Sequence, residues 1–98
     1  MEDVFSVIQA IVPDIQEVLS LRVSILHELE HASHRIGRKA LAEKVQVTER
    51  VLRTAIDVLR EQSLVDVNNA GIKLTVFGHQ KIKAYDVLAR KANRLYGL

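Results

Sequence analysis

One short motif in the sequence matches a known catalytic pattern. His27, Glu28 and His31 reproduce H-E-x-x-H, which in zinc proteases places two histidine ligands one helical turn apart with the glutamate as general base. Such a site needs a third ligand, and the nearest downstream candidate, Glu49, is better placed to begin a helix. Both histidines also fall opposite the apolar stripe of their predicted helix, facing solvent. We therefore expect no zinc catalysis and no resident metal, with weak adventitious nickel or zinc binding that includes His34 as the alternative.

The rest of the sequence offers no enzymatic arrangement. It contains no Ser/His/Asp set, no glycine-rich phosphate loop and no carboxylate pair in a catalytic context, so we predict that the protein is not an enzyme. Its charges are instead divided along the chain. Residues 1–34 carry one basic and six acidic side chains, whereas residues 35–98 carry thirteen basic and six acidic ones. A segment that approaches phosphates shows such a basic excess, although a solvated surface can show it as well.

The basic part begins with two predicted helices joined by a tight turn. The longer helix covers Thr48–Gln62, and Thr48 can cap it because the threonine side chain accepts from first-turn N–H groups. The preceding segment Gly37–Val45 is typical of a shorter helix, with only Gln46–Val47 between the two. Such a pair predicts a helix-turn-helix. At about 100° per residue the predicted inward side chains of the longer helix are Val51, Leu52, Ala55, Ile56, Val58 and Leu59.

A predicted β-hairpin follows the two helices. Leu64–Val67 and Ile72–Thr75 are β-favouring runs around Asn68–Gly71, whose asparagines and glycine tolerate the positive φ that hairpin loops need. Arg35–Gly37 could supply a short third strand. A helix-turn-helix followed directly by a hairpin is the winged-helix arrangement, so we predict a mainly α fold with a small β-hairpin. Winged helices also serve as protein-binding modules, and the fold alone leaves the function open.

Further helices are predicted on both sides of this winged-helix core, which covers residues 13–75. Residues 3–12 form a dense apolar segment, predicted as an extra N-terminal helix that either caps the core or packs on a second subunit. The first core helix should run from Pro13 to about His31. Residues 76–98 are predicted as a long amphipathic C-terminal helix whose second half points past the core. We expect one domain over residues 1–98, taken from a longer regulator, that self-associates through the N-terminal and C-terminal helices.

Arg22 is unusual because it falls within the apolar stripe of the first core helix. A guanidinium in that position must find a partner or extend to the edge of the core. The favoured partner is a carboxylate of the fold, such as Asp57 or Asp66, because buried charges are usually compensated internally. The alternative is that the Arg22 head group reaches a phosphate.

Composition excludes several other classes of protein. The chain has 98 residues, of which 48% are apolar, enough for one domain with one core. The absence of cysteine excludes a disulfide framework and thiol chemistry. No apolar run reaches the ~20 residues that cross a bilayer, and Met1–Asp3 lacks the basic start of a signal peptide. We predict a soluble cytoplasmic protein that does not contact a membrane.

Several short segments between Ile11 and Gly78 carry a family resemblance. They are Pro13-Asp14, Arg22-x-x-Ile25-Leu26, Ile36-Gly37-Arg38, Glu49-Arg50-Val51-Leu52-Arg53, Leu59, Glu61-Gln62-x-Leu64-Val65-Asp66 and Leu74-Thr75-x-x-Gly78. Together they resemble the DNA-binding domains of bacterial central glycolytic genes regulators, within the SorC-type family of sugar-responsive transcription factors. In that family an amino-terminal winged helix binds operator DNA, and a larger carboxy-terminal domain binds a phosphorylated sugar such as fructose-1,6-bisphosphate.

The resemblance implies a transcriptional repressor of glycolytic or sugar-metabolism genes whose effector domain is absent here, so we expect no cofactor in this domain. Helix-turn-helix proteins present the amino-terminal part of the second helix to base edges in the major groove. The predicted base contacts are Arg50, Arg53, Thr54 and Asp57, the last of which either orients Arg53 or accepts from a cytosine. The predicted phosphate contacts are Arg38, Lys39, Thr48, Asn68, Asn69 and Lys73. The alternative function is a protein-binding winged helix whose basic face docks an acidic partner.

Overall fold

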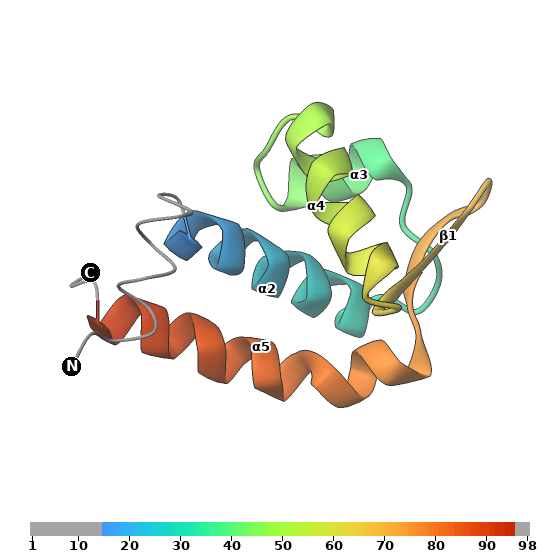
Figure 1. Cartoon of the computed structure of the whole chain (residues 1–98). Coiled ribbons are helices and arrows are strands. Elements are labelled where there is room, and N and C mark those ends of the chain that lie inside the picture. Colours follow the sequence, from blue (N-terminus) through green and yellow to red (C-terminus); the bar gives the residue numbers. More distant parts are fainter. Residues whose placement is uncertain (1–14, 96–98) are drawn as a thin grey trace.

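The structure, a computed structural model, describes residues 15–95 and confirms the predicted winged helix-turn-helix (Figure 1). The elements are α2 (Ile15–His31), α3 (Arg38–Lys44), α4 (Glu49–Glu61), β1 (Val65–Asn68), β2 (Gly71–Leu74) and α5 (Val76–Leu95). The helix predicted over residues 3–12 lies outside the described residues. No helix in the described part of the chain is long and apolar enough to span a bilayer.

Helix α4 begins at the predicted cap. The Thr48 hydroxyl oxygen accepts from the backbone N–H of Val51 at 3.2 Å, and Glu49 lies in the first turn, where the helix dipole favours a negative charge. The buried face of the helix is formed by Leu52, Ala55, Ile56 and Leu59. The prediction that Val51 also points inward is wrong: its side chain is 45% exposed, because it lies at the edge of the stripe, beside α2.

The turn between α3 and α4 depends on one left-handed residue. Gln46 has a φ of 60°, which ends α3, and the Val47 N–H donates back to the Ala42 carbonyl at 3.0 Å. Leu41 in α3 is fully buried, and Val45 is half-buried against the core, as predicted. The two helices are thereby held in the compact arrangement that exposes the outer face of α4.

Strands β1 and β2 form the wing, an antiparallel hairpin that pairs Val65 with Leu74 and Asn68 with Gly71. Of the predicted loop residues only Gly71 has a positive φ, 127°, and a Cβ there would lie 2.8 Å from the Ile36 carbonyl oxygen. Ile36 exchanges two backbone hydrogen bonds with Ile72, at 3.0 and 2.9 Å. The predicted third strand is therefore a single bridge at the edge of the wing.

Helix α5 turns back and runs along α2 (Figure 1). Its second half lies past the buried core, as predicted, with Val87 and Leu88 exposed, but it runs beside α2 (Figure 1). The chain can reverse there because Gly78 lies against the backbone of Leu64, where a Cβ would be only 2.1 Å from the carbonyl oxygen. Ile82 is buried against the core, and Asp86 reaches His27 on α2.

The hydrophobic core lies where α2, α3, α4 and the wing meet. Its largest fully buried side chains come from all four of these parts: they are Ile25, Leu26, Leu41, Leu52, Leu59 and Ile72. The core therefore fixes the helix-turn-helix and the wing relative to each other, and the side chains on the outer faces of both are carried by one rigid unit.

Candidate nucleic-acid interface

The outer face of α4 carries the predicted base-reading residues. Arg50, Arg53, Thr54 and Asp57 are all exposed, and their spacing of three and four residues places them along one side of the helix. The Thr54 hydroxyl donates to the Arg50 carbonyl at 3.3 Å, so it already has one partner. No ion pair joins Arg53 to Asp57 within residues 15–95, which leaves the arginine head group to solvent or a ligand.

A hollow joins the start of α3 to the wing. Its volume is about 370 Å³, and its lining includes Gly37, Arg38, Asn68, Asn69 and Gly71. Arg38 and the two asparagines were predicted to contact phosphate from different elements, and the fold places them around one hollow. The side-chain Oδ1 of Asn68 accepts from the Ala70 N–H at 2.8 Å, which shapes the loop.

The other predicted phosphate contacts are also exposed. Lys39 follows Arg38 in the first turn of α3, and Lys73 lies on β2 opposite Asp66. The Thr48 oxygen accepts from the backbone as the cap of α4, but its hydroxyl proton can still be donated to a phosphate. The predicted contacts therefore come from α3, α4 and the wing, the parts that a winged helix presents to a duplex.

Comparison with known proteins supports this interpretation of the face. Residues 18–88 match the family described as CggR N-terminal DNA binding domain. The chain belongs to this family. Two curated relatives are both named Central glycolytic genes regulator. The one from Bacillus subtilis is 33% identical over 76 residues, which cover 78% of this chain and 22% of the relative. The one from Priestia megaterium is 30% identical over 95 residues, which cover 97% of this chain and 28% of the relative.

The chain therefore spans about a quarter of the length of these relatives. The segment that matches the CggR N-terminal DNA-binding domain includes every residue predicted to contact a base or a phosphate. Both relatives are named as regulators. The roles of individual side chains in this face stay predictions, because they depend on the bound duplex.

Arg35 is a residue of this DNA-binding domain that the sequence analysis missed. One terminal nitrogen of its guanidinium donates to the backbone carbonyls of Asp66 at 3.1 Å and Gly71 at 3.0 Å, and the other pairs with the Asp66 carboxylate. Arg35 thus ties both strands of the wing to the segment before α3. Its sequence signal is the Arg35/Asp66 pair, which becomes visible only when the register of the hairpin is known.

The Arg35 contact also sets the charge on the outer face of the wing. The hydrogen bond from Arg35 holds the pKa of Asp66 below its ordinary value, and the positive charges of Arg35, Lys73 and Arg60 act in the same direction against the opposing effect of desolvation. Asp66 is therefore a carboxylate already matched by Arg35. Lys73, across the strand pair, keeps a positive charge that a phosphate can neutralise.

Neither of the two carboxylates named as possible partners of Arg22 pairs with it. Asp66 pairs with Arg35, and no ion pair joins Arg22 to Asp57 among the described residues. The Arg22 Nε is buried and has no hydrogen-bond partner there. The physical reason is that the register of the wing brings Asp66 next to Arg35, which a helical projection of α2 cannot show.

The two histidines of the H-E-x-x-H match make hydrogen bonds within the fold. The His27 Nε2 lies 3.0 and 3.1 Å from the Asp86 carboxylate oxygens, and the His31 Nδ1–H donates to the His27 carbonyl at 2.8 Å. The prediction that His27 faces only solvent is wrong, because α5 packs against that side of α2. Among residues 15–95, no group of three His, Cys, Asp or Glu side chains could hold a metal ion.

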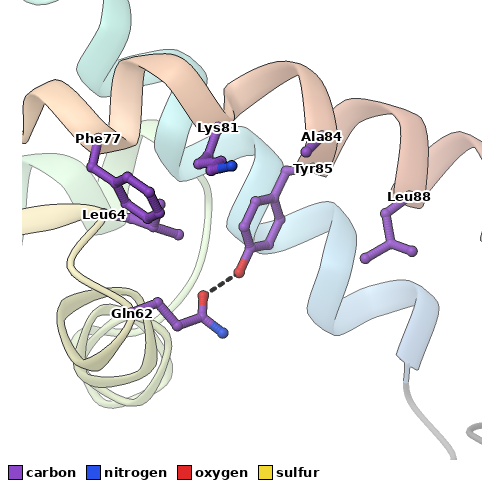
Figure 2. A pocket seen from close by; sticks show the side chains of 7 residues that line it. All are labelled: Gln62, Leu64, Phe77, Lys81, Ala84, Tyr85 and Leu88. Atoms are coloured by element: carbon purple, nitrogen blue, oxygen red, sulfur yellow. Dashed lines mark hydrogen bonds between the residues drawn. The ribbon is translucent and has the colours of Figure 1, made fainter.

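A second surface lies away from this face, on α5. The hollow on this surface has a volume of about 310 Å³ and is lined by Gln62, Leu64, Phe77, Lys81, Ala84, Tyr85 and Leu88. The Tyr85 hydroxyl donates to the Gln62 side chain (Figure 2). Phe77 is 45% exposed and Leu88 39%, while the Lys81 Nζ lies 5.3 Å from the centre of the Phe77 ring. Its lining is mainly apolar, unlike the charged outer face of α4.

Proposed function

We propose that this chain is the DNA-binding part of a transcriptional repressor that occupies an operator controlling glycolytic or other sugar-metabolism genes. The observation that carries the proposal is the exposed stripe of Arg50, Arg53, Thr54 and Asp57 on α4, within a domain of a DNA-binding family. The names of both relatives support the class of genes. A repressor of this kind acts in the cytoplasm, where the bacterial chromosome lies.

In this proposal α4 enters the major groove. Arg50 and Arg53 read base edges, since an arginine reaching guanine O6 and N7 discriminates by about 1–3 kcal/mol per base. Thr54 and Asp57 contribute from the same face. The start of α3, the cap of α4 and the wing hold the duplex. Their phosphate contacts position the domain without reading sequence, and the residues are Arg38, Lys39, Thr48, Asn68, Asn69 and Lys73.

We place the sensing of a phosphorylated sugar, such as fructose-1,6-bisphosphate, outside residues 1–98. The relatives extend well beyond the length of this chain. This domain should therefore bind DNA with the same affinity in the presence and absence of the sugar phosphate.

The test is a titration of the protein against duplex DNA at several salt concentrations. Several phosphate contacts predict a steep loss of affinity, with a slope of about −0.9 per contact in a plot of log affinity against log salt. A duplex enriched from a random pool should bind more tightly than a scrambled one. A domain that binds neither duplex, or whose binding does not depend on salt, would instead fit a module that docks an acidic protein.

We further propose that two copies of the domain associate through the α5 hollow. The exposed side chains of Phe77 and Leu88 offer apolar contact area, which a second copy would remove from water. A two-fold pair implies a symmetric operator with half-sites one helical turn, or a multiple of it, apart. Sedimentation should show concentration-dependent association that Phe77→Glu abolishes, with exposed Lys83→Glu as the control. A strict monomer up to millimolar concentration would contradict this interface.

A further inference from the structure

Arg22 lies in a hollow between α2 and α4, next to the DNA-reading face. The hollow has a volume of about 240 Å³ and is lined, besides Arg22, by Val18, Leu21, Val51, Thr54 and Ala55. The surroundings of the guanidinium are therefore mostly apolar. Its Nε is buried without a hydrogen-bond partner in the described part of the chain. Among the guanidinium nitrogens only Nε is in this buried, unsatisfied state, so an acceptor from outside the domain meets the two terminal nitrogens.

The fold directs the carboxylates that could have neutralised Arg22 elsewhere. Asp66 is bound by Arg35 on the wing, and Asp57 points outward from α4 as an exposed side chain. Neither makes an ion pair with Arg22 within residues 15–95. The positive charge thus remains available beside Thr54, a residue that belongs both to this hollow and to the exposed stripe of α4.

The dimensions of DNA predict which acceptor the Arg22 guanidinium meets in the hollow between α2 and α4. The major groove is about 12 Å wide, and a helix with its side chains is about 10–12 Å across, so a helix in the groove has a phosphate backbone along each side. The hairpin and α2 lie on different sides of α4 (Figure 1). On the side of the wing, we expect the hollow lined by Arg38 and the hairpin to meet one backbone. Arg22 is the cation next to α4 on the side of α2.

We infer that Arg22 binds a phosphate of the DNA backbone on the α2 side of the major groove, so that the duplex is held on both sides of α4. This inference rests on the proposed DNA binding. The phosphate oxygens accept from the terminal nitrogens of the guanidinium, next to the apolar side chains of Val18, Leu21 and Val51. Arg22 holds the duplex without reading its sequence.

The experiment compares Arg22→Met with wild type on an enriched duplex and its scrambled version at four salt concentrations. Methionine keeps an unbranched apolar side chain at this position and removes the charge and the donors. Affinity for both duplexes should fall about tenfold, the effect of one charge-assisted hydrogen bond, and the salt slope should flatten by about 0.9. Arg22→Lys should keep the salt slope. Lys83→Met, on the exposed surface of α5, should change neither quantity.

Thermal unfolding followed by circular dichroism controls for folding. Arg22→Met should melt at the wild-type temperature or above it, since replacing a poorly compensated charge with an apolar side chain is often stabilising. If folded Arg22→Met bound both duplexes as tightly as wild type, with the same salt slope, the inference would be overturned while the proposed function stood. If wild type bound neither duplex at low salt, the proposed function would fall, and this inference with it.

Discussion

Three arginines near the proposed DNA face differ in what surrounds them. Arg53 is exposed on α4, Arg35 is bound to the wing, and Arg22 lies in an apolar hollow without a partner among the described residues. An exposed guanidinium can rearrange to match a base, whereas a guanidinium held by two carbonyls and a carboxylate has a structural role. The environment of each side chain therefore predicts a different effect of its removal.

Arg53→Ala should reduce affinity for an enriched duplex while leaving affinity for a scrambled duplex nearly unchanged. The reason is that a base contact is worth about 1–3 kcal/mol only on the matching sequence. Lys73→Ala should weaken binding to both duplexes by similar factors and flatten the salt slope by about one unit. Titration of each variant at fixed and varied salt measures both effects. An equal loss on both duplexes for Arg53→Ala would make Arg53 a phosphate contact.

Arg35→Met should lower the free energy of unfolding by about 1–3 kcal/mol, because it leaves a partly buried set of carbonyl acceptors on the wing without their donor. Asp66→Asn is the matched control. It removes the ion pair but keeps both backbone acceptors and their donor. It should therefore lower the free energy of unfolding by less than Arg35→Met does. Urea denaturation followed by circular dichroism measures both variants. Equal stability of Arg35→Met and wild type would show that the wing does not depend on this contact.

At the scale of the elements, the packing of α5 against Leu64, in the segment between α4 and β1, depends on Gly78. An alanine inside a helix normally stabilises it by about 1 kcal/mol relative to glycine. Here the added Cβ would lie 2.1 Å from the Leu64 carbonyl oxygen, so α5 must shift. Gly78→Ala should therefore destabilise the domain by about 1–3 kcal/mol, as overpacking does, and lower the melting temperature by several degrees.

The control for Gly78 is Gly37→Ser, which also adds a Cβ. Nothing lies within 4 Å of the position that this Cβ would occupy, and Gly37 already has an extended conformation that any residue adopts. Its melting temperature should match or slightly exceed that of wild type, because serine is a good cap for α3. A stable Gly78→Ala variant would show that α5 is not held in place at Leu64.

At the scale of the whole molecule, His27 joins α2 to α5 and makes this contact sensitive to pH. The hydrogen bond to Asp86 raises the pKa of His27, with smaller contributions from the charges of Asp86 and Glu30 that oppose the effect of burial. The contact therefore stabilises the fold fully below about pH 6.5, the ordinary pKa of histidine, and is lost as the pH rises through the raised value. The side chain is 40% exposed, so we expect only about 0.5 kcal/mol.

Denaturation of wild type and His27→Gln at pH 5.5 and pH 8 measures this effect. The wild type should be more stable than the variant at pH 5.5, and the difference should shrink at pH 8, because glutamine does not titrate. Other titrating groups cancel in the comparison. A difference that is the same at both pH values would mean that His27 packs between the helices without a charged contact to Asp86.

The sequence by itself determined the local elements and the family. Apolar periodicity, the Thr48 cap and the Asn68–Gly71 turn predict α4 and the hairpin, because helix and hairpin signals act over a few neighbouring residues. The order of these elements, together with the E-R-V-L-R segment at Glu49–Arg53, indicated the winged helix and its family. The same periodicity also placed Arg50 and Arg53 on the solvent face of α4.

Only the tertiary structure decided which distant side chains meet. The register of the wing pairs Asp66 with Arg35 instead of Arg22, and the return of α5 along α2 brings Asp86 to His27. Helical periodicity shows which face of an element is apolar, but it does not show which neighbour covers that face. Long-range packing sets these partners, and it therefore decided that Arg22 lies in a hollow beside α4 without either of its predicted carboxylate partners.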